Sequence, residues 1–247
     1  TLLEGGAVLV VENGTLVRRE LQIGLRNWDF SEILSGLSAT LPLLFSAMCL
    51  AVAFAVPAGI IAAFRQNRAA DLAATSLAVG LTSVPAFWFG LVLIEVFPVN
   101  LRWLPSSGAG SWRHLILPAI VLASTQIGLI TRLTRGSVIE VLQMDYIRTA
   151  RAKGASFRRI VLAHVLRNAA VPTVTVVGLQ SGMLLGGAVV TETVFNWPGV
   201  GRLLIQSVLY RDYPLLQGLI LLFGVTFVVI NLLVDLTNMT IDPRLRA

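Results

Sequence analysis

Long apolar runs constrain this chain more than any other feature. A helix needs about 20 mostly apolar residues to cross a membrane, and five runs meet that length: Leu37 to Phe64, Leu72 to Phe97, Leu115 to Leu133, Val165 to Val190 and Leu215 to Leu236. The composition agrees, because 55% of the 247 residues are hydrophobic and 13% are charged, whereas soluble domains carry about 25% charged residues. We therefore expect an all-α membrane protein with five membrane-spanning helices.

The connections between these runs alternate in charge. Arginine and lysine are concentrated in residues 65–71, 134–165 and 242–247, and they are sparse in residues 98–114 and 191–214. Short loops rich in arginine and lysine stay in the cytoplasm, so we place the first three segments inside and the other two outside, together with the N-terminal segment. An external start with five spans implies another span upstream, and we expect six in the full-length protein.

Residues 1–36 differ in composition from the membrane domain that we expect over residues 37–247. Asn13 and Gly14 lie between two short apolar stretches, and an Asn-Gly pair is favoured in two-residue hairpin turns. We interpret this segment as a short external connector, with or without a β-hairpin.

Residues that could build an enzyme site are scarce. Cys49 is the single cysteine, and the two histidines, His114 and His164, are expected at opposite faces of the membrane. The sequence contains no GxSxG, no HExxH and no phosphate-binding GxxxxGK[ST] motif. We therefore predict no catalytic residue, no metal site and no cofactor bound by this chain. These observations disfavour an intramembrane protease, and the lack of an internal repeat or a central acid disfavours a secondary transporter or channel.

The basic stretch from Arg132 to Arg167 is the most informative connection. Each arginine or lysine costs about 2.5–3.5 kcal/mol at the centre of a membrane helix, so this stretch must lie outside the lipid. Apolar residues at helical spacing, Gly154 as a helix stop and Ser156 as an N-cap predict a short exposed helix, a glycine turn and a helix that returns to the membrane. Two simpler interpretations stay open: a solvated loop, or a surface that contacts anionic lipid.

Several polar side chains lie inside the apolar runs. They either face a central cavity or bridge neighbouring helices, and they are candidates for lining a transport path: Thr125, Gln126, Gln180, Ser181 and Asn231. Residues 196–199 contain a turn signal, and residues 200–210 have helical spacing. We expect this external segment to fold over the outer mouth.

The basic segment resembles the cytoplasmic loop of ABC importer permeases, and the peptide/nickel branch with its B-type dipeptide and oligopeptide permeases is the most similar. It reads DYIRTARAKG at 145–154, RRI at 158–160 and HVLRN at 164–168. Similar stretches continue over residues 37–247, with LSATL at 37–41, SVPAFW at 83–88, WLP at 103–105, RHLILP at 113–118, ETVFNWPGVG at 192–201, RDYP at 211–214 and DPR at 242–244. Arg148, Thr149 and Ala150 replace the Glu-Ala-Ala of the general importer signature, which favours the peptide branch over sugar or amino acid importers.

The resemblance implies a permease subunit that forms half of the substrate pathway of an ATP-driven importer in the bacterial cytoplasmic (inner) membrane. Such a subunit is not an enzyme by itself. The implied partners are a second permease in a heterodimer, two ATPase subunits that bind ATP and Mg²⁺, an extracytoplasmic substrate-binding protein and membrane lipid, but no nucleic acid. Di- or oligopeptides are the expected substrates, and nickel, glutathione or another small solute is the alternative.

The resemblance also assigns roles to residues. The short helix is expected to dock in a cleft of an ATPase subunit through small residues that allow close approach and cations that pair with acids: Asp145, Tyr146, Arg148, Thr149, Ala150, Arg151, Ala152, Lys153, Gly154 and Ala155. The external gate, in contact with the binding protein, is expected to consist of Glu192, Phe195, Trp197, Pro198, Gly199 and Gly201.

Overall fold

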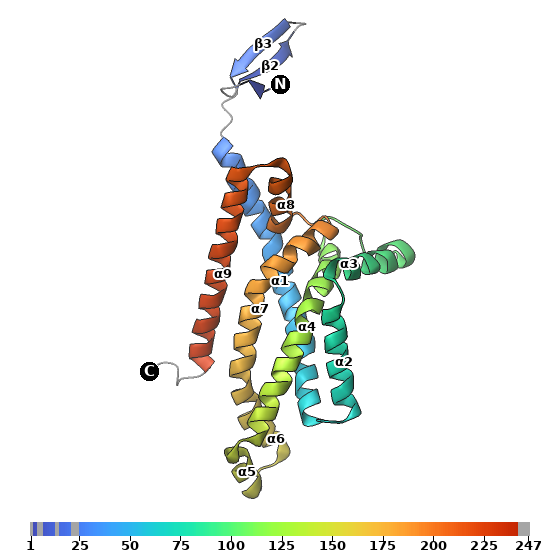
Figure 1. The fold of residues 1–247 in the computed structure, drawn as a ribbon, viewed down its shortest axis with the longest axis vertical. Coiled ribbons are helices and arrows are strands. Elements are labelled where there is room, and N and C mark those ends of the chain that lie inside the picture. The colour runs from blue at the N-terminus through green and yellow to red at the C-terminus, as the bar shows by residue number, and fades with distance from the viewer. Residues whose placement is uncertain (1, 4–6, 13–14, 21–24, 242–247) are drawn as a thin grey trace.

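The computed structural model describes residues 2–3, 7–12, 15–20 and 25–241. Its helices pack into one elongated bundle (Figure 1). The elements in chain order are β1 (Leu2–Leu3), β2 (Ala7–Glu12), β3 (Thr15–Glu20), α1 (Leu25–Phe64), α2 (Ala69–Ser83), α3 (Ala86–Ile94), the π-helical segment η1 (Glu95–Leu101), α4 (Trp112–Gln143), α5 (Asp145–Ala152), α6 (Phe157–Ile160), the π-helical segment η2 (Val161–Val165), α7 (Leu166–Val194), α8 (Val200–Tyr210) and α9 (Tyr213–Ile241).

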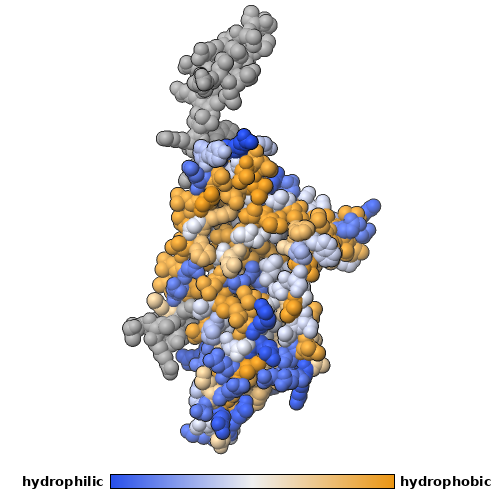
Figure 2. All heavy atoms as spheres, in the orientation of Figure 1, coloured by the Kyte–Doolittle hydropathy of each residue, from blue (hydrophilic) through white to orange (hydrophobic). Residues whose placement is uncertain are grey.

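Four stretches of helix in the described part of the chain are long and apolar enough to cross a membrane. They are Glu32–Phe64, Trp112–Gln143, Phe157–Val194 and Tyr213–Thr237, and they correspond to the first, third, fourth and fifth predicted runs. Figure 2 shows apolar side chains around the middle of the bundle and hydrophilic ones gathered at its lower end. The predicted all-α membrane fold is therefore confirmed.

The second predicted run, residues 72–97, is not one straight helix. It is divided between α2 and α3, which are bent by 94° relative to each other, and counting this pair as one span gives five. Pro85 causes the break, because a proline lacks an N–H and disfavours the helical conformation of the residue before it. Val84 is accordingly extended, with φ −85° and ψ 125°. As a result α3 projects sideways from the bundle (Figure 1).

The two ends of the bundle carry different connections (Figure 1). One end, called the α5 end below, holds the α1–α2 connection, α5, α6 and the end of α9. The opposite end, called the α8 end, holds the start of the described part of α1, the elbow between α2 and α3, and α8. This arrangement matches the predicted alternation of the connections. The arginines of residues 242–247, which belong to that prediction, lie outside the described residues.

Strands precede the first helix. β2 and β3 pair antiparallel, with Ala7 opposite Glu20 and Glu12 opposite Thr15, which is the pairing of a hairpin. The turn predicted at Asn13 and Gly14 lies outside the described residues. The helix α1 begins at Leu25, so it starts upstream of the predicted first span and crosses the boundary that we predicted after residue 36.

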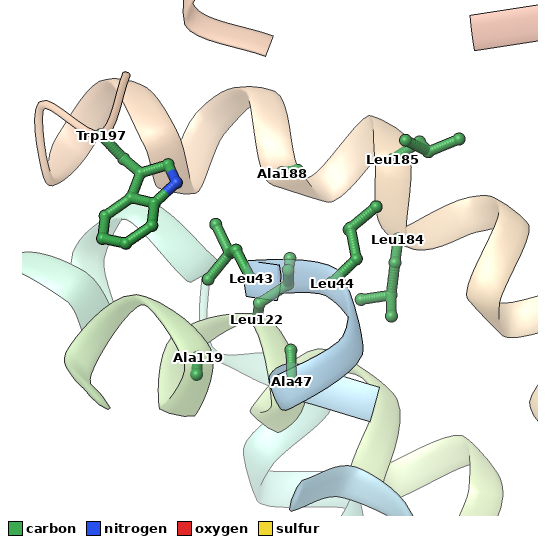
Figure 3. Packing of buried hydrophobic residues seen from close by; sticks show 9 residues of the cluster. All are labelled: Leu43, Leu44, Ala47, Ala119, Leu122, Leu184, Leu185, Ala188 and Trp197. Carbon is green, nitrogen blue, oxygen red and sulfur yellow. The ribbon is translucent and has the colours of Figure 1, made fainter. Parts of the chain in front are cut away.

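The core lies where α1, α4 and α7 meet. Figure 3 shows nine side chains of this core: Leu43, Leu44 and Ala47 of α1, Ala119 and Leu122 of α4, Leu184, Leu185 and Ala188 of α7, and Trp197. Tight packing of interdigitated apolar side chains makes such a core rigid. The three helices are therefore the frame on which the other elements are placed.

Glycines bring neighbouring helices into very close contact. A Cβ on Gly128 of α4 would lie 2.4 Å from the carbonyl oxygen of Ala78 on α2, and a Cβ on Gly59 of α1 would lie 2.7 Å from the carbonyl oxygen of Thr131 on α4. Small residues at such crossings are the usual means of helix association in membranes. Both α1 and α2 are thus held directly against α4.

Candidate functional site

The short helix predicted within the basic segment is present as α5. It starts at Asp145, directly after Met144, whose extended backbone (φ −66°, ψ 143°) separates it from α4. One side chain anchors it to the bundle: Ile147 is fully buried and packs in a cluster with Val138, Val141 and Ile160. Displacing α5 must therefore also displace the adjoining end of α4.

The turn after α5 ends the helix in a defined way. Gly154 has φ +79°, its N–H donates to the carbonyl oxygen of Arg151 at 3.0 Å, and the N–H of Ala155 donates to the carbonyl oxygen of Ala150 at 3.1 Å. These two bonds and the left-handed residue form a Schellman motif, which favours glycine. Ser156 then caps α6, because its hydroxyl accepts the N–H of Arg159 at 3.4 Å. Both sequence predictions for this turn are confirmed.

Most residues predicted to dock an ATPase are exposed on α5 and the turn after it. Ala150 and Ala155 are exceptions, because they are half-buried against the bundle. The contact of Arg148 with Asp145 measures 3.7 Å and joins two exposed groups, so it contributes little. Among the described residues, no carboxylate pairs with the nearby cations Arg151, Lys153, Arg158 and Arg159. The α5 end thus presents several unpaired positive charges on a rigid support.

Aromatic side chains complete this surface. The ring of Tyr146 lies 6.3 Å from that of His164, and partial burial raises the pKa of the Tyr146 phenol. Phe157 packs edge-on against Phe64 at 5.3 Å between ring centroids, yet it stays largely exposed. A partner that covers α5 would therefore also meet apolar area.

Three of the five pathway candidates come together between α4 and α7. The amide of Gln180 donates to the side-chain oxygen of Gln126, and the amide of Gln126 donates to the hydroxyl of Thr125 at 3.2 Å. Ser181 donates instead to the carbonyl oxygen of Val177 in its own helix, and Asn231 donates within α9 to Phe227. The glutamine pair bridges two spans, as one of the two predicted alternatives requires.

At the α8 end, Glu192 is fully buried. One carboxylate oxygen accepts the hydroxyl of Thr40 on α1 at 2.6 Å, and the other accepts the N–H of Arg202 at 3.0 Å. The N–H of Gly201 also donates to this carboxylate. Since the first N–H groups of a helix attract negative charge, Glu192 fixes the start of α8 against α1 and α7.

The other predicted gate residues are largely part of this same packing. Phe195, Trp197 and Gly201 are buried, and the indole N–H of Trp197 donates to the carbonyl oxygen of Ala39 at 3.0 Å. Gly199 has no room for a side chain, because a Cβ there would lie 2.2 Å from the Glu192 carboxylate. Of the predicted set only Pro198 is exposed. In this conformation the buried members support the loop and offer no surface to a binding protein.

Sequence reasoning missed an ion pair at the α5 end. Asp71 of α2 is 5% exposed. Arg135 of α4 donates a hydrogen bond to each of its carboxylate oxygens, from Nε to Oδ1 at 2.6 Å and from Nη2 to Oδ2 at 2.8 Å. In the sequence, Arg135 is one of several cations in the basic stretch from Arg132 to Arg167. An acid placed at the start of an apolar helix was the signal that could have drawn attention to Asp71.

Comparison with known proteins gives a consistent result. Residues 55–247 match the family described as the binding-protein-dependent transport system inner membrane component. The chain is 51% identical over 215 residues to the glutathione transport system permease protein GsiC of Escherichia coli strain K12, covering 87% of this chain and 70% of that protein. The GsiC protein of Shigella dysenteriae serotype 1 (strain Sd197) gives the same identity and coverage.

Solved structures show the same fold at low sequence identity. An inward-facing structure of the MetNI methionine ABC transporter has a TM-score of 0.72 and 17% identity, covering 89% of this chain and 99% of that one. The structure of an amino acid ABC transporter has a TM-score of 0.69 and 16% identity, covering 87% of this chain and 97% of that one. Together with the family match over most of its length, these findings show that the chain belongs to the binding-protein-dependent transport system inner membrane components, as an ABC importer permease of the peptide/nickel family.

Proposed function

We propose that this permease forms half of a substrate pathway that is opened and closed by ATPase subunits docked on α5. The observation that carries the proposal is the rigid, unpaired cationic surface around α5. The same positive charges support a cytoplasmic position for the α5 end, because short loops rich in arginine and lysine stay on that side. The α8 end then faces the extracytoplasmic binding protein.

The chemistry of the α5 surface fits an acidic cleft on a partner. Arg151 and Lys153 are exposed and have no acidic partner among the described residues. Two ATPase subunits, one on this permease and one on a second permease, supply the sites for ATP and Mg²⁺. Their closure over nucleotide displaces α5, and the Ile147 cluster passes the displacement to the adjoining spans as a rigid-body movement.

The glutamine pair marks the part of the bundle that we assign to the pathway. Gln126 and Gln180 are polar groups deep in two apolar spans, and polar groups in a membrane are satisfied by each other or by a water-filled path. Their amides can exchange the present hydrogen bond for bonds to the peptide groups of a passing solute. Thr125, Ser181 and Asn231 stay candidates for the same role.

A short peptide is the substrate class that we propose, with glutathione as its first candidate. Glutathione is itself a tripeptide, and the likeness to permeases of glutathione transport systems supports this choice. Amide side chains such as those of Gln126 and Gln180 suit a substrate with peptide groups better than a bare metal ion, because Ni²⁺ is suited by imidazole ligands. Nickel is thus the weaker alternative.

The test is uptake by the complete importer in proteoliposomes. The permease is reconstituted with its second permease, ATPases and binding protein, and ATP-dependent uptake of labelled glutathione, a dipeptide and Ni²⁺ is compared. We expect uptake of the peptides and none of the metal. Uptake of Ni²⁺ alone contradicts the proposed substrate class.

A variant of α5 tests the docking part separately. Arg151→Glu combined with Lys153→Glu reverses the charge of the docking surface and should leave the purified complex without ATPase subunits. Arg132→Glu is the matched control, because Arg132 is an exposed cation on α4 outside the docking helix. Retention of the ATPases by the α5 variant contradicts docking at this surface.

A further inference from the structure

The ion pair between Asp71 and Arg135 joins more than two side chains. The carboxylate of Asp71 also accepts the N–H of Asn67 at 2.9 Å, and Asn67 has the left-handed backbone conformation with φ +60°. A longer contact of 3.4 Å links the same carboxylate to the hydroxyl of Thr75. One buried carboxylate therefore fixes the α1–α2 connection, the first turns of α2 and the neighbouring α4.

Arg135 lies on the part of α4 that carries α5. From Arg135 the helix continues without a break to Gln143, and along this stretch Val138 and Val141 pack against the buried anchor Ile147 of α5. A displacement of α5 therefore moves the helix segment that holds the guanidinium. Because the guanidinium contacts Asp71 through two parallel hydrogen bonds, the pair resists both sliding and rotation of α2 against α4.

The contact between α2 and α4 continues toward the α8 end. Two helical turns above Arg135, Gly128 approaches Ala78 and Thr82 so closely that no side chain fits between the helices. After Pro85, α3 packs its side chains Phe89 and Leu93 in the cluster that contains the buried Phe195. Phe195 lies in the loop between α7 and α8, residues 195–199, which Glu192 fixes and which is called the outer loop below. Through these contacts α2 and α3 connect the α5 end with the outer loop.

We propose that Asp71 and Arg135 are a positioning pair that transmits the displacement of α5 through α2 to the elbow and the outer loop. This inference rests on the proposed function, because it takes α5 as the element that the ATPases move. The pair touches neither solute nor nucleotide in this account. It makes α2 follow α4, so that the two mouths of the pathway change together.

The first test measures coupling in the complete importer in proteoliposomes. Asp71→Asn keeps the shape of the side chain and removes its charge. Arg135→Lys keeps the charge and removes the pair of parallel hydrogen bonds. Arg132→Gln is the control for loss of a cation from α4. We expect Asp71→Asn to hydrolyse ATP at a near-normal rate while solute uptake per ATP falls about tenfold, within the usual range of coupling energies. Arg135→Lys should fall between Asp71→Asn and the unaltered protein, and Arg132→Gln should match the unaltered protein.

A merely structural role gives a different result. Uptake and ATP hydrolysis would then fall in parallel with the amount of assembled complex, and their ratio would stay constant in both variants. A constant ratio overturns the proposal. If Asp71→Asn does not assemble, the ratio measured for Arg135→Lys decides in the same way. The exchanged pair, Asp71→Arg with Arg135→Asp, should regain part of the lost coupling.

The second test follows the two movements separately with spin labels, after Cys49→Ser removes the native thiol. One label pair, at the exposed positions Gln143 and Val228, reports the movement of the end of α4 that carries α5 relative to α9; the other, at Ser83 and Val228, reports the movement of the outer end of α2. We expect ATP to change both distances in the unaltered importer, but only the first in Asp71→Asn. If ATP still changes the distance between Ser83 and Val228 fully in Asp71→Asn, the positioning role is contradicted, but the proposed function is not. If ATP leaves the distance between Gln143 and Val228 unchanged in the unaltered importer, the proposed function is contradicted as well.

Discussion

Asp71 and Glu192 are two carboxylates buried at opposite ends of one bundle, and they are stabilised in opposite ways. Asp71 is matched by the guanidinium of Arg135, with both oxygens held. Glu192 has no cation beside it in the described part of the chain: its partners are a hydroxyl and backbone N–H groups. Even Arg202, which gives its N–H to Glu192, directs its guanidinium to the carbonyl oxygen of Asn196 at 3.3 Å.

This difference shows what each carboxylate is suited to do. An ion pair between two helices can move with them as one link, since its two parallel hydrogen bonds join one side chain directly to the other. A carboxylate held by the start of α8 fixes a loop, since moving α8 would leave several N–H groups and a buried charge without partners. We therefore expect Glu192 to hold the outer loop and Asp71 to transmit movement.

Glu192→Ala tests the stronger side of this comparison. It leaves the N–H groups of Gly201 and Arg202 and the hydroxyl of Thr40 without their acceptor, and each unsatisfied buried group costs about 1–3 kcal/mol. On that basis we expect the free energy of unfolding to fall by about 4 kcal/mol. The measurement is the thermal unfolding midpoint of the purified permease, which should drop strongly. Glu95→Ala is the control, because Glu95 is exposed. Equal midpoints for the two variants would mean that Glu192 does not hold the loop.

The two partners of the ion pair should differ in how much stability is lost when each is replaced. Arg135→Ala leaves the Asp71 carboxylate buried without a cation, whereas Asp71→Ala leaves a guanidinium that is partly exposed and can turn toward water. We expect the unfolding midpoint to fall further for Arg135→Ala than for Asp71→Ala. The double variant should fall less than the sum of the two, because the partners act as a unit. Additive effects contradict the direct pairing.

Substitutions at two glycines should have smaller effects on stability, one through a steric clash and the other through backbone strain. Gly199→Ala drives a Cβ into the Glu192 carboxylate without any unusual backbone angle, and overpacking of this kind costs about 2 kcal/mol. Gly154→Ala has open space around it but requires φ +79°, which costs about 1 kcal/mol. Unfolding midpoints of both variants measure the difference. A larger effect at Gly154 than at Gly199 would remove the support for a tightly closed Glu192 site.

The sequence was sufficient where local chemistry determines the structure. Residues 200–210 form α8 as their spacing indicated, and Gly154 and Ser156 end and start helices as expected of their backbone and capping preferences. Four of the five spans that the long apolar runs predicted are continuous helices in the described part of the chain. All these features depend on residues a few positions apart.

Prolines show where local sequence is insufficient. Pro42 and Pro57 stay inside α1, and Pro118 and Pro172 stay inside α4 and α7, while Pro85 ends α2 and turns the chain by 94°. Each proline removes the same N–H, so the outcome depends on whether neighbouring helices hold the chain straight. That information is not contained in the residues around Pro85.

The two carboxylates show the same limit. Asp71 and Arg135 are 64 residues apart in sequence, and each has an ordinary interpretation as a charge beside an apolar run. Glu192 lies in a stretch that the resemblance had marked as external, which hid the fact that α8 folds back over it. The environments of both carboxylates depend on contacts between distant segments of the chain, which the local sequence does not contain.

A cross-linking measurement tests the central claim most directly, namely that the ATPase acts on α5. In the Cys49→Ser importer, a photoreactive group is attached to a cysteine at Ala152 on α5 or, as the matched control, at Ser83 at the other end of α2; both positions are exposed. We predict that illumination joins the Ala152 variant to an ATPase subunit and leaves the Ser83 variant free of it. Capture of the ATPase from Ser83, or no capture from Ala152, contradicts the account.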